Sequence, residues 1–234
     1  SKATLGTGAF ILANMGTAQP RSANRLLGTV LYQMGEERIF ALEGSVFAAG
    51  SIIKWLRDSL GILSSSDESA ELARSVADNG SVTFLPALAG LGAPYWLPET
   101  KAAISGLTFA STRAHIVRGA LEAISHIFVD LAQAFAADGA AWQVLRIDGG
   151  MSANDWLAQD LADMLGLRCD RPDDIETTAR GAAMLAAVGS GLYPSLRAAM
   201  AMLPAGRTFQ PQMEPAARPE RLELWHAELA KLTR

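Results

Sequence analysis

The sequence has few of the residues that mark secreted, metal-stabilised or nucleic-acid-binding proteins. Among 234 residues there are one cysteine, Cys169, and three histidines, so an internal disulfide is excluded and a Cys/His zinc site is not expected. Lysine and arginine number 20 against 24 aspartates and glutamates, for a net charge of −4. Without a basic excess we expect no nucleic-acid partner.

Long apolar runs are also missing. No stretch approaches the roughly 18 consecutive apolar residues that span a bilayer, and the chain does not open with the charged and apolar segments of a secretory signal. We therefore expect a cytoplasmic protein without membrane contact.

What the chain does contain is apolar side chains for a sizeable core. Hydrophobic residues make up 50% and charged residues 19% of the sequence, which excludes a disordered chain. The sequence opens at Ser1 on a strand, a glycine turn and a second strand. Because a domain seldom begins inside a hairpin, we expect a piece of a longer polypeptide.

The first half predicts a small antiparallel sheet followed by helices. β-prone segments at residues 26–32 and 39–42 flank a polar turn, which is typical of a hairpin. We expect a helix near residues 46–60, a capped shorter helix at residues 68–77, and a strand at residues 82–85.

The second half alternates helices and strands, so the whole is predicted to be one α/β domain. Apolar residues at steps of three and four from Ile116 to Phe135 predict a long amphipathic helix. After it we expect a strand at 144–147, a helix at 156–165 ending at Gly166, a strand at 167–169, a helix from Thr177 to Gly191, and a terminal helix at 222–232. Residues 204–219 are the one linker-like segment.

The first candidate site is the triplet Gly6-Thr7-Gly8 between two apolar strands. Glycines let the backbone approach a ligand closely, and free amides with the Thr7 hydroxyl can hold phosphate oxygens. The alternative is a hairpin turn whose glycines adopt positive φ.

A second candidate is the pair Gly149-Gly150, which joins a buried strand to a helix. In open α/β sheets, ligands bind where a strand ends and the N–H groups of a helix N-terminus are free. Two glycines leave room for a flat base or ribose. Asn154, in the first turn of that helix, would hydrogen-bond a base edge or cap the helix.

The third candidate is Gly50 with Lys54, four residues apart and thus on one helix face. The glycine leaves room for a flat ligand or allows close helix packing, and the lysine contacts a ligand or is solvated. No Ser/His/Asp grouping, Cys/His grouping or P-loop occurs. No catalytic residue and no metal ligand is assigned in this chain.

Five segments, taken in order, carry a resemblance to a known family. They lie at residues 5–10, 41–50 with 55–58, 90–96, 104–108 with 115–118, and 148–150. In these segments the chain resembles the C-terminal half of a carbohydrate kinase of the FGGY family, and the glycerol kinases within it most of all.

The resemblance implies an α/β fold of the actin-like ATPase (ribonuclease-H-like) type, with a mixed sheet flanked by helices. Residues 1–234 would form the C-terminal nucleotide-binding domain of a two-domain kinase whose N-terminal domain is absent from this chain. Such kinases hold ATP and a polyol between their domains and transfer the γ-phosphoryl to a primary hydroxyl. With glycerol as acceptor, the product is glycerol 3-phosphate.

The resemblance also implies residue roles on the nucleotide. Thr7 would meet the phosphates in a turn shaped by Gly6 and Gly8. The Gly149-Gly150 turn would lie against the adenosine, which Gly150 borders.

Further roles follow from the same resemblance. Gly50 would also border the adenosine, Asn154 would contact the adenine, and Phe10 would pack on the glycerol carbon chain. Lys54 stands where glycerol kinases often have glutamine, and a lysine cannot accept a hydrogen bond.

In the family, the general base and the first phosphate loop lie in the N-terminal half, so this chain alone is predicted to be inactive. Mg²⁺ should accompany ATP or ADP. An apolar patch facing the absent domain would favour self-association into a homo-oligomer.

Three alternatives stay open. The first is a kinase of the same family whose acceptor is xylulose, gluconate or a similar polyol. The second is a non-catalytic actin-like nucleotide-binding module. The third is an α/β domain whose glycine turns are purely structural.

Overall fold

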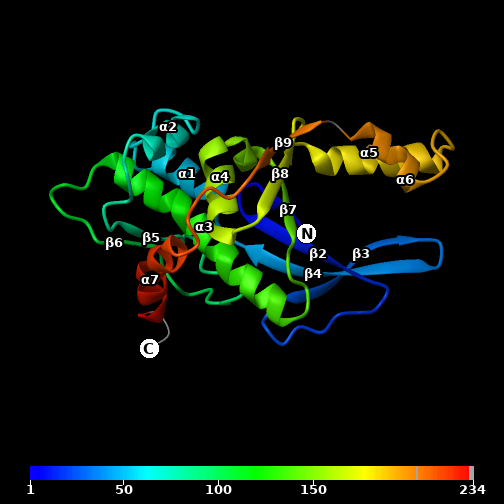
Figure 1. Cartoon of the computed structure of the whole chain (residues 1–234), viewed down its shortest axis with the longest axis horizontal. Coiled ribbons are helices and arrows are strands. Elements are labelled where there is room, and N and C mark those ends of the chain that lie inside the picture. The colour runs from blue at the N-terminus through cyan, green and yellow to red at the C-terminus, as the bar shows by residue number, and fades with distance from the viewer. Residues whose placement is uncertain (204, 232–234) are drawn as a thin grey trace.

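A seven-stranded sheet in the order β3-β4-β2-β1-β7-β8-β9 forms the centre of this computed structural model, which describes residues 1–203 and 205–231 (Figure 1). Its strands are β1 (Lys2–Leu5), β2 (Ala9–Gly16), β3 (Leu27–Met34), β4 (Glu37–Val46), β7 (Val144–Asp148), β8 (Arg168–Pro172) and β9 (Gly206–Phe209). A separate pair consists of β5 (Thr83–Leu85) and β6 (Ala103–Ser105).

The helices are α1 (Gly50–Asp58), α2 (Glu68–Arg74), α3 (Arg113–Ala137), α4 (Asp155–Leu165), α5 (Thr177–Gly189), α6 (Leu196–Ala199) and α7 (Ala217–Ala230). Two short 3₁₀ turns are η1 (Gly150–Ala153) and η2 (Met200–Met202).

The sheet is mixed, as predicted. β1, β7 and β8 run parallel to one another, whereas the β1–β2, β2–β4, β3–β4 and β8–β9 pairs are antiparallel. Because parallel neighbours end at the same edge of a sheet, the carboxyl ends of β1 and β7 lie side by side. Each of these two ends runs into one of the predicted glycine turns.

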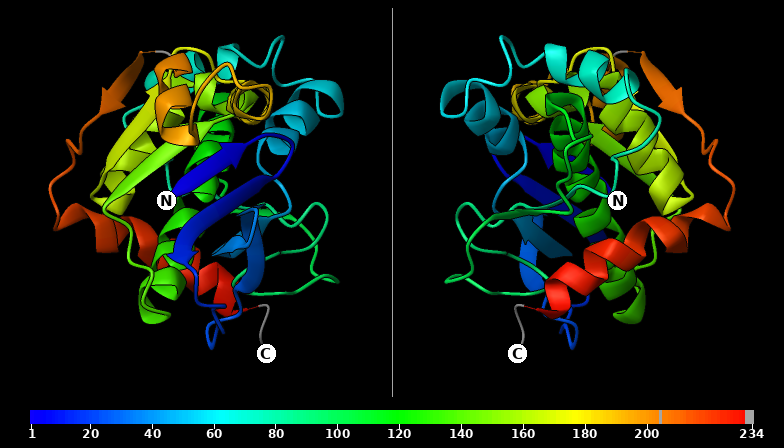
Figure 2. Two further views of the ribbon diagram at one scale, coloured as in Figure 1. Left: turned by 90° about the vertical axis from the view of Figure 1, so that its right-hand side faces the viewer. Right: turned by 90° about the vertical axis from the view of Figure 1, so that its left-hand side faces the viewer.

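The two faces of the sheet differ because successive side chains of a strand point to opposite sides. One face is apolar and buried, and it includes Ala3, Leu5, Ile11, Leu42, Leu145, Ile147 and Cys169. Helix α3 packs on it so closely that a Cβ on Gly44 would lie 2.8 Å from Leu131. Figure 2 shows α3, α4 and α7 in front of this face in its right-hand view.

The opposite face is polar. One row of register partners crosses it from β4 to β9 and consists of Glu43, Leu12, Lys2, Arg146, Asp170 and Thr208. The left-hand view of Figure 2 shows β1 and β7 from this side, with α5 near one end of the sheet. The helical hairpin of α5 and α6 projects away from the strands (Figure 1).

Helix α3 is 25 residues long and by length and composition alone would suit a membrane span. Its most apolar 18-residue window is 78% buried inside the fold, so α3 is the core helix of this domain. A capping box of Thr112 and His115 fixes its start.

Cys169 lies on β8 with no exposed surface. Burial raises the pKa of its thiol to about 12, and the carboxylates of Asp170 and Asp163 add to that shift. The thiol therefore stays protonated and unreactive at neutral pH.

Most predicted elements are confirmed, the helix expected at 68–77 ends at Arg74, and three further predictions differ more from the structure. The helix expected near residues 46–60 begins at Gly50, because β4 continues to Val46 in register with Ala9. The segment 204–219 is no simple linker: it contains edge strand β9, whose Phe209 is buried with the guanidinium groups of Arg171 and Arg207 over its ring.

The third difference concerns the terminal helix expected at 222–232. Helix α7 begins five residues earlier, at Ala217, and reaches Ala230. The predicted position Leu232 and the linker's first residue, Pro204, lie outside the described residues.

Candidate functional site

The two predicted glycine turns meet at one edge of the sheet. Thr4 of β1 pairs with Asp148 of β7, one position before Gly149. The turns are so close that a Cβ on Gly149 would lie 2.7 Å from the Leu5 carbonyl oxygen. Gly149 has a φ of +83°, a conformation that favours glycine.

The N-terminus of α1 joins the same place. The Gly50 amide donates to the Gly6 carbonyl at 2.9 Å, and the amides of Ala49 and Ser51 donate to the Thr7 carbonyl at 2.9 and 3.0 Å. A Cβ on Gly50 would lie 3.8 Å from the Met151 Cβ. The structure thus brings together three segments that are far apart in the chain, as a shared binding site requires.

The glycines of this cluster fall into two groups. A Cβ added to Gly8 would lie 2.3 Å from the Val46 carbonyl oxygen. A Cβ added to Gly50 would lie 2.6 Å from the Gly6 carbonyl oxygen. Gly8, Gly50 and Gly149 therefore allow backbone segments to pack.

Open space surrounds the second group. At Gly150 no atom lies within 4 Å of a built Cβ, and at Gly6 the nearest is the Gly8 carbonyl oxygen at 3.8 Å. The Thr7 side chain between the glycines of the first turn is exposed. Room for a ligand is thus found at Gly6, Thr7 and Gly150.

Asn154 caps α4. Its side-chain oxygen accepts from the Leu157 amide at 3.0 Å, and its amide nitrogen donates to the Ser69 hydroxyl of α2 at 3.1 Å. These contacts match the capping alternative and hold α2 against the start of α4. A base edge would compete with Ser69 for the same amide group.

Lys54 and Phe10 are both exposed. Lys54 lies one turn after Gly50 on α1. Phe10 is 53% exposed on the polar face of the sheet, where it pairs with Thr4 of β1 and Ser45 of β4. An exposed aromatic ring at this place can pack against the carbon chain of a ligand.

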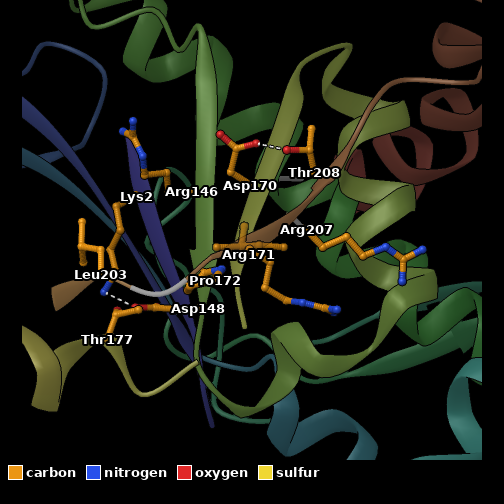
Figure 3. A pocket seen from close by; sticks show the side chains of 12 residues that line it. Lys2, Arg146, Asp148, Asp170, Arg171, Pro172, Thr177, Leu203, Arg207 and Thr208 are labelled. Atoms are coloured by element: carbon orange, nitrogen blue, oxygen red, sulfur yellow. Dashed lines mark hydrogen bonds and ion pairs between the residues drawn. The ribbon is translucent and has the colours of Figure 1, made fainter. Parts of the chain in front are cut away.

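A cavity of about 460 Å³ opens on the polar face beside the two turns (Figure 3). Its lining includes Lys2, Arg146, Asp148, Asp170, Thr177 and Leu203. Within it the Lys2 ammonium lies 2.9 Å from a carboxylate oxygen of Asp148. Sequence reasoning assigned no role to either residue, although an aspartate directly before Gly149-Gly150 was a usable signal.

The described residues offer no grouped set of metal ligands. In the ranges 1–203 and 205–231 no three His, Cys, Asp or Glu side chains are grouped so that they could hold an ion. The described residues therefore do not fit a protein-bound metal centre, and we assign no chemistry to one.

Comparison with known proteins agrees with this geometry. The sequence profile of the C-terminal domain of the FGGY family of carbohydrate kinases matches residues 1–190. The chain is 46% identical over 230 residues to a glycerol kinase of Coxiella burnetii and 46% identical over 227 residues to that of Gluconobacter oxydans. These alignments cover 98% and 97% of this chain but 46% and 44% of the two relatives.

Among solved structures, a Plasmodium falciparum glycerol kinase with ADP superposes with a TM-score of 0.89 at 30% identity, over 98% of this chain and 46% of that one. A xylulose kinase from Lactobacillus acidophilus superposes with a TM-score of 0.82 at 20% identity, over 99% of this chain and 47% of that one, which shows the fold alone.

The mixed sheet and its flanking helices define a domain of the actin-like (ribonuclease-H-like) kinase fold. The chain belongs to the FGGY family of carbohydrate kinases and matches its C-terminal domain. It spans about half the length of the curated relatives that it matches.

Proposed function

We propose that this chain is the C-terminal, nucleotide-binding half of an ATP-dependent glycerol kinase, which transfers the γ-phosphoryl of ATP to a glycerol hydroxyl and gives glycerol 3-phosphate. The observation that carries the proposal is the convergence of the Gly6–Gly8 turn, the Gly149-Gly150 turn and the start of α1 at one sheet edge. The 46% identity to glycerol kinases over nearly the whole chain supports the acceptor.

In this proposal the nucleotide phosphates approach Thr7, whose exposed hydroxyl and backbone serve as hydrogen-bond donors. The open space at Gly150 takes the adenosine, and Gly50 borders it from α1. Asn154 contacts the adenine through the amide that donates to Ser69 in the free domain.

Glycerol would lie over the polar face of the sheet. Phe10 packs on its carbon chain from this side. Lys54, as a hydrogen-bond donor, reaches nucleotide acceptors on the α1 side.

Phosphoryl transfer depends on positioning and on electrostatic stabilisation of the transferred group. We expect the general base in the N-terminal half of the full-length kinase, with Mg²⁺ carried on the nucleotide phosphates. The isolated chain should therefore show no glycerol-dependent turnover in a coupled assay. Turnover well above the ATPase background would contradict this assignment.

The partner of this domain is the N-terminal half of the kinase, and the expected compartment is the cytoplasm. The polar face of the sheet and the exposed apolar residues of the α5–α6 hairpin are the surfaces that we assign to that partner.

Calorimetric titration with Mg-ADP tests the nucleotide site. Wild-type chain should bind saturably, and Gly150→Trp should abolish binding because the indole fills the open space beside the turn. Gly189→Trp, at a glycine with equally open surroundings at the end of α5, is the matched control and should bind normally.

Equal binding by all three proteins would place the nucleotide elsewhere. If the wild-type chain does not bind, the titration is repeated on the full-length kinase, where failure would leave the glycines purely structural.

Another acceptor is the main alternative. Solved xylulose and gluconate kinases superpose on this chain with TM-scores of 0.82 and 0.80, at 20% and 19% identity. Sequence similarity is much higher to glycerol kinases, which favours glycerol. Turnover of the full-length kinase on a panel of polyols would identify the acceptor.

A further inference from the structure

One ion pair lies where both glycine turns begin. The Lys2 ammonium is 2.9 Å from a carboxylate oxygen of Asp148 and also donates to the Thr4 hydroxyl. Lys2 and Thr4 belong to β1 and Asp148 belongs to its parallel neighbour β7. Figure 3 shows the Lys2 side chain reaching across to Asp148 on the polar face.

The position of the pair along the strands matters. Asp148 is the last residue of β7 and directly precedes Gly149, and Thr4 lies two residues before Gly6. Glycines carry no side chains that could hold the turns together. The ion pair is therefore a side-chain link between the two strand ends from which the turns emerge.

The burial of Asp148 makes its carboxylate depend on this ion pair. The residue is 2% exposed, and an ionised carboxylate that is removed from water needs a nearby counter-charge. Among the residues that the structure describes, the Lys2 ammonium is the only ionic partner of the carboxylate, and neither carboxylate oxygen accepts a hydrogen bond. Lys2 itself is partly exposed, with 37% of its side-chain surface accessible.

Backbone contacts extend the link into the turns. The Gly149 amide donates to the Ile175 carbonyl just before α5 at 3.1 Å, and the Gly6 amide donates to the Gly8 carbonyl at 2.9 Å. A shift of the β7 end would disturb the Gly149 hydrogen bond, and loosening of the β1 end, which holds Lys2 and Thr4, would disturb the Gly6 hydrogen bond.

We infer that Lys2 and Asp148 are positioning residues that fix the separation of the Gly6–Gly8 and Gly149-Gly150 turns, and so the geometry of the nucleotide site. The inference rests on the proposed function for its link to nucleotide. The positioning itself can be measured without any ligand.

A general contribution of the pair to sheet stability is the competing explanation. It would raise amide exchange throughout the sheet equally and would leave the turns in place. Site-resolved exchange separates the two explanations because it reports local opening and global unfolding at different amides.

Three variants of the chain are compared with wild type: Lys2→Met, Asp148→Asn and the double variant. Lys2→Met leaves the Asp148 carboxylate buried without its counter-charge, so it should be the most disruptive, and the double variant should recover part of the loss. Arg146→Met is the matched control, because Arg146 is exposed on the same face and is the register partner of Lys2.

Hydrogen exchange followed by NMR is the first measurement. In Lys2→Met the Gly6 and Gly149 amides should exchange about tenfold faster, whereas amides in the middle of β2 and β4 change about twofold or less. The double variant should exchange more slowly than Lys2→Met, and Arg146→Met should match wild type. Unchanged turn amides, or equal acceleration across the sheet, would overturn the inference.

Calorimetry with Mg-ADP is the second measurement. Where wild type binds, the dissociation constant should rise about tenfold in Lys2→Met and less in the double variant. Unchanged affinity in Lys2→Met, despite faster exchange of the turn amides, would overturn the link to nucleotide. Absence of binding by wild-type chain and full-length kinase alike would defeat the proposed function, while the exchange data would still decide the positioning role.

Discussion

Glycines that look equivalent in the sequence differ in what surrounds them in the fold. Gly8 and Gly50 are covered by backbone carbonyls, and Gly150 borders open space. The sequence left both a ligand-binding and a structural role open for these glycines, because a glycine pattern shows where side chains are missing and not what fills the gap. Only the packing separates a glycine that admits backbone from one that can admit a ligand.

This difference can be tested at Gly8 and Gly150. Gly8→Ala should lower the free energy of unfolding by about 1–3 kcal/mol, because the new methyl group would lie 2.3 Å from the Val46 carbonyl oxygen. Gly150→Ala should change it by about 0.5 kcal/mol or less, since its surroundings are open. Urea unfolding of both variants measures the difference, and equal losses would contradict it.

His126 should make stability depend on pH. Burial lowers the pKa of this side chain to about 3, and the nearby positive charge of Arg221 is the second largest cause of the shift. The unfolded chain binds a proton below about pH 6.5 while the folded chain resists it, so stability present at neutral pH is lost as the pH falls from about 6.5 towards 3.

The expected size is a slope approaching about 1.4 kcal/mol per pH unit within that window. His126→Gln removes the titrating group, so its unfolding free energy should depend less steeply on pH between pH 4.5 and 6.5. The measurement is urea unfolding at several pH values. Parallel curves for variant and wild type would refute the role of His126.

At the scale of elements, α7 is held by polar anchors. Arg221 pairs with Glu122 of α3 at 3.1 Å and with Asp160 of α4 at 2.7 Å. The Trp225 indole, fully buried, donates to Asp130 of α3 at 2.8 Å. These contacts place a helix from outside the matched family profile against the two core helices.

Arg221→Met should therefore destabilise the fold by about 3 kcal/mol, because two buried carboxylates lose a counter-charge. Burial already raises the pKa of Glu122, and loss of Arg221 raises it further. A raised pKa means that the folded state holds a proton more tightly, so the deficit should grow as the pH rises above the ordinary glutamate range.

Unfolding of Arg221→Met at pH 5 and pH 8 measures this trend. The double variant Arg221→Met/Glu122→Gln removes one of the two carboxylates that lose Arg221, and because Glu122 still pairs with Arg118 at 2.9 Å in the single variant, it should recover part of the stability at pH 8. A deficit that shrinks with rising pH would contradict the assignment.

Much of the element order follows from the sequence. The three-and-four spacing from Ile116 to Phe135 identified α3, and Gly166 was correctly placed as the end of α4, with a φ of +66°. Strand β9 was missed because a short edge strand is held by its neighbour β8 and by two stacked arginines, not by its own apolar pattern.

The site was only partly predictable for a similar reason. The turns themselves carry local signals, but the Lys2–Asp148 pair joins the second residue of the sequence to a residue far along it, and the contact depends on strand order. No local pattern specifies that β1 lies next to β7.

At the scale of the whole molecule, the α5–α6 hairpin leaves apolar side chains in solvent. Leu185, Leu192, Met200 and Leu203 are all exposed, and Leu192 retains 73% of its accessible surface. Apolar side chains gathered on one projecting segment are typical of a surface that another polypeptide covers.

We expect the isolated chain to self-associate through this hairpin. Sedimentation velocity should show a concentration-dependent increase in mass for wild type, and Leu185→Lys/Leu192→Lys should sediment as a monomer because charge on the patch opposes its burial. Phe109→Lys, at an exposed residue in the loop between β6 and α3, is the control and should behave as wild type; Figure 1 shows this loop on the far side of the molecule from the α5–α6 hairpin. A monodisperse wild-type monomer at high concentration would count against self-association.

The buried thiol of Cys169 is also a native probe of how often the fold opens. The chain has a single cysteine, so a sulfhydryl reagent can label each molecule only once. That cysteine lies on β8, on the buried face of the sheet, so a reagent reaches the thiol only when the fold opens. The rate of labelling therefore reports the rate of these openings in the native chain, without an engineered probe.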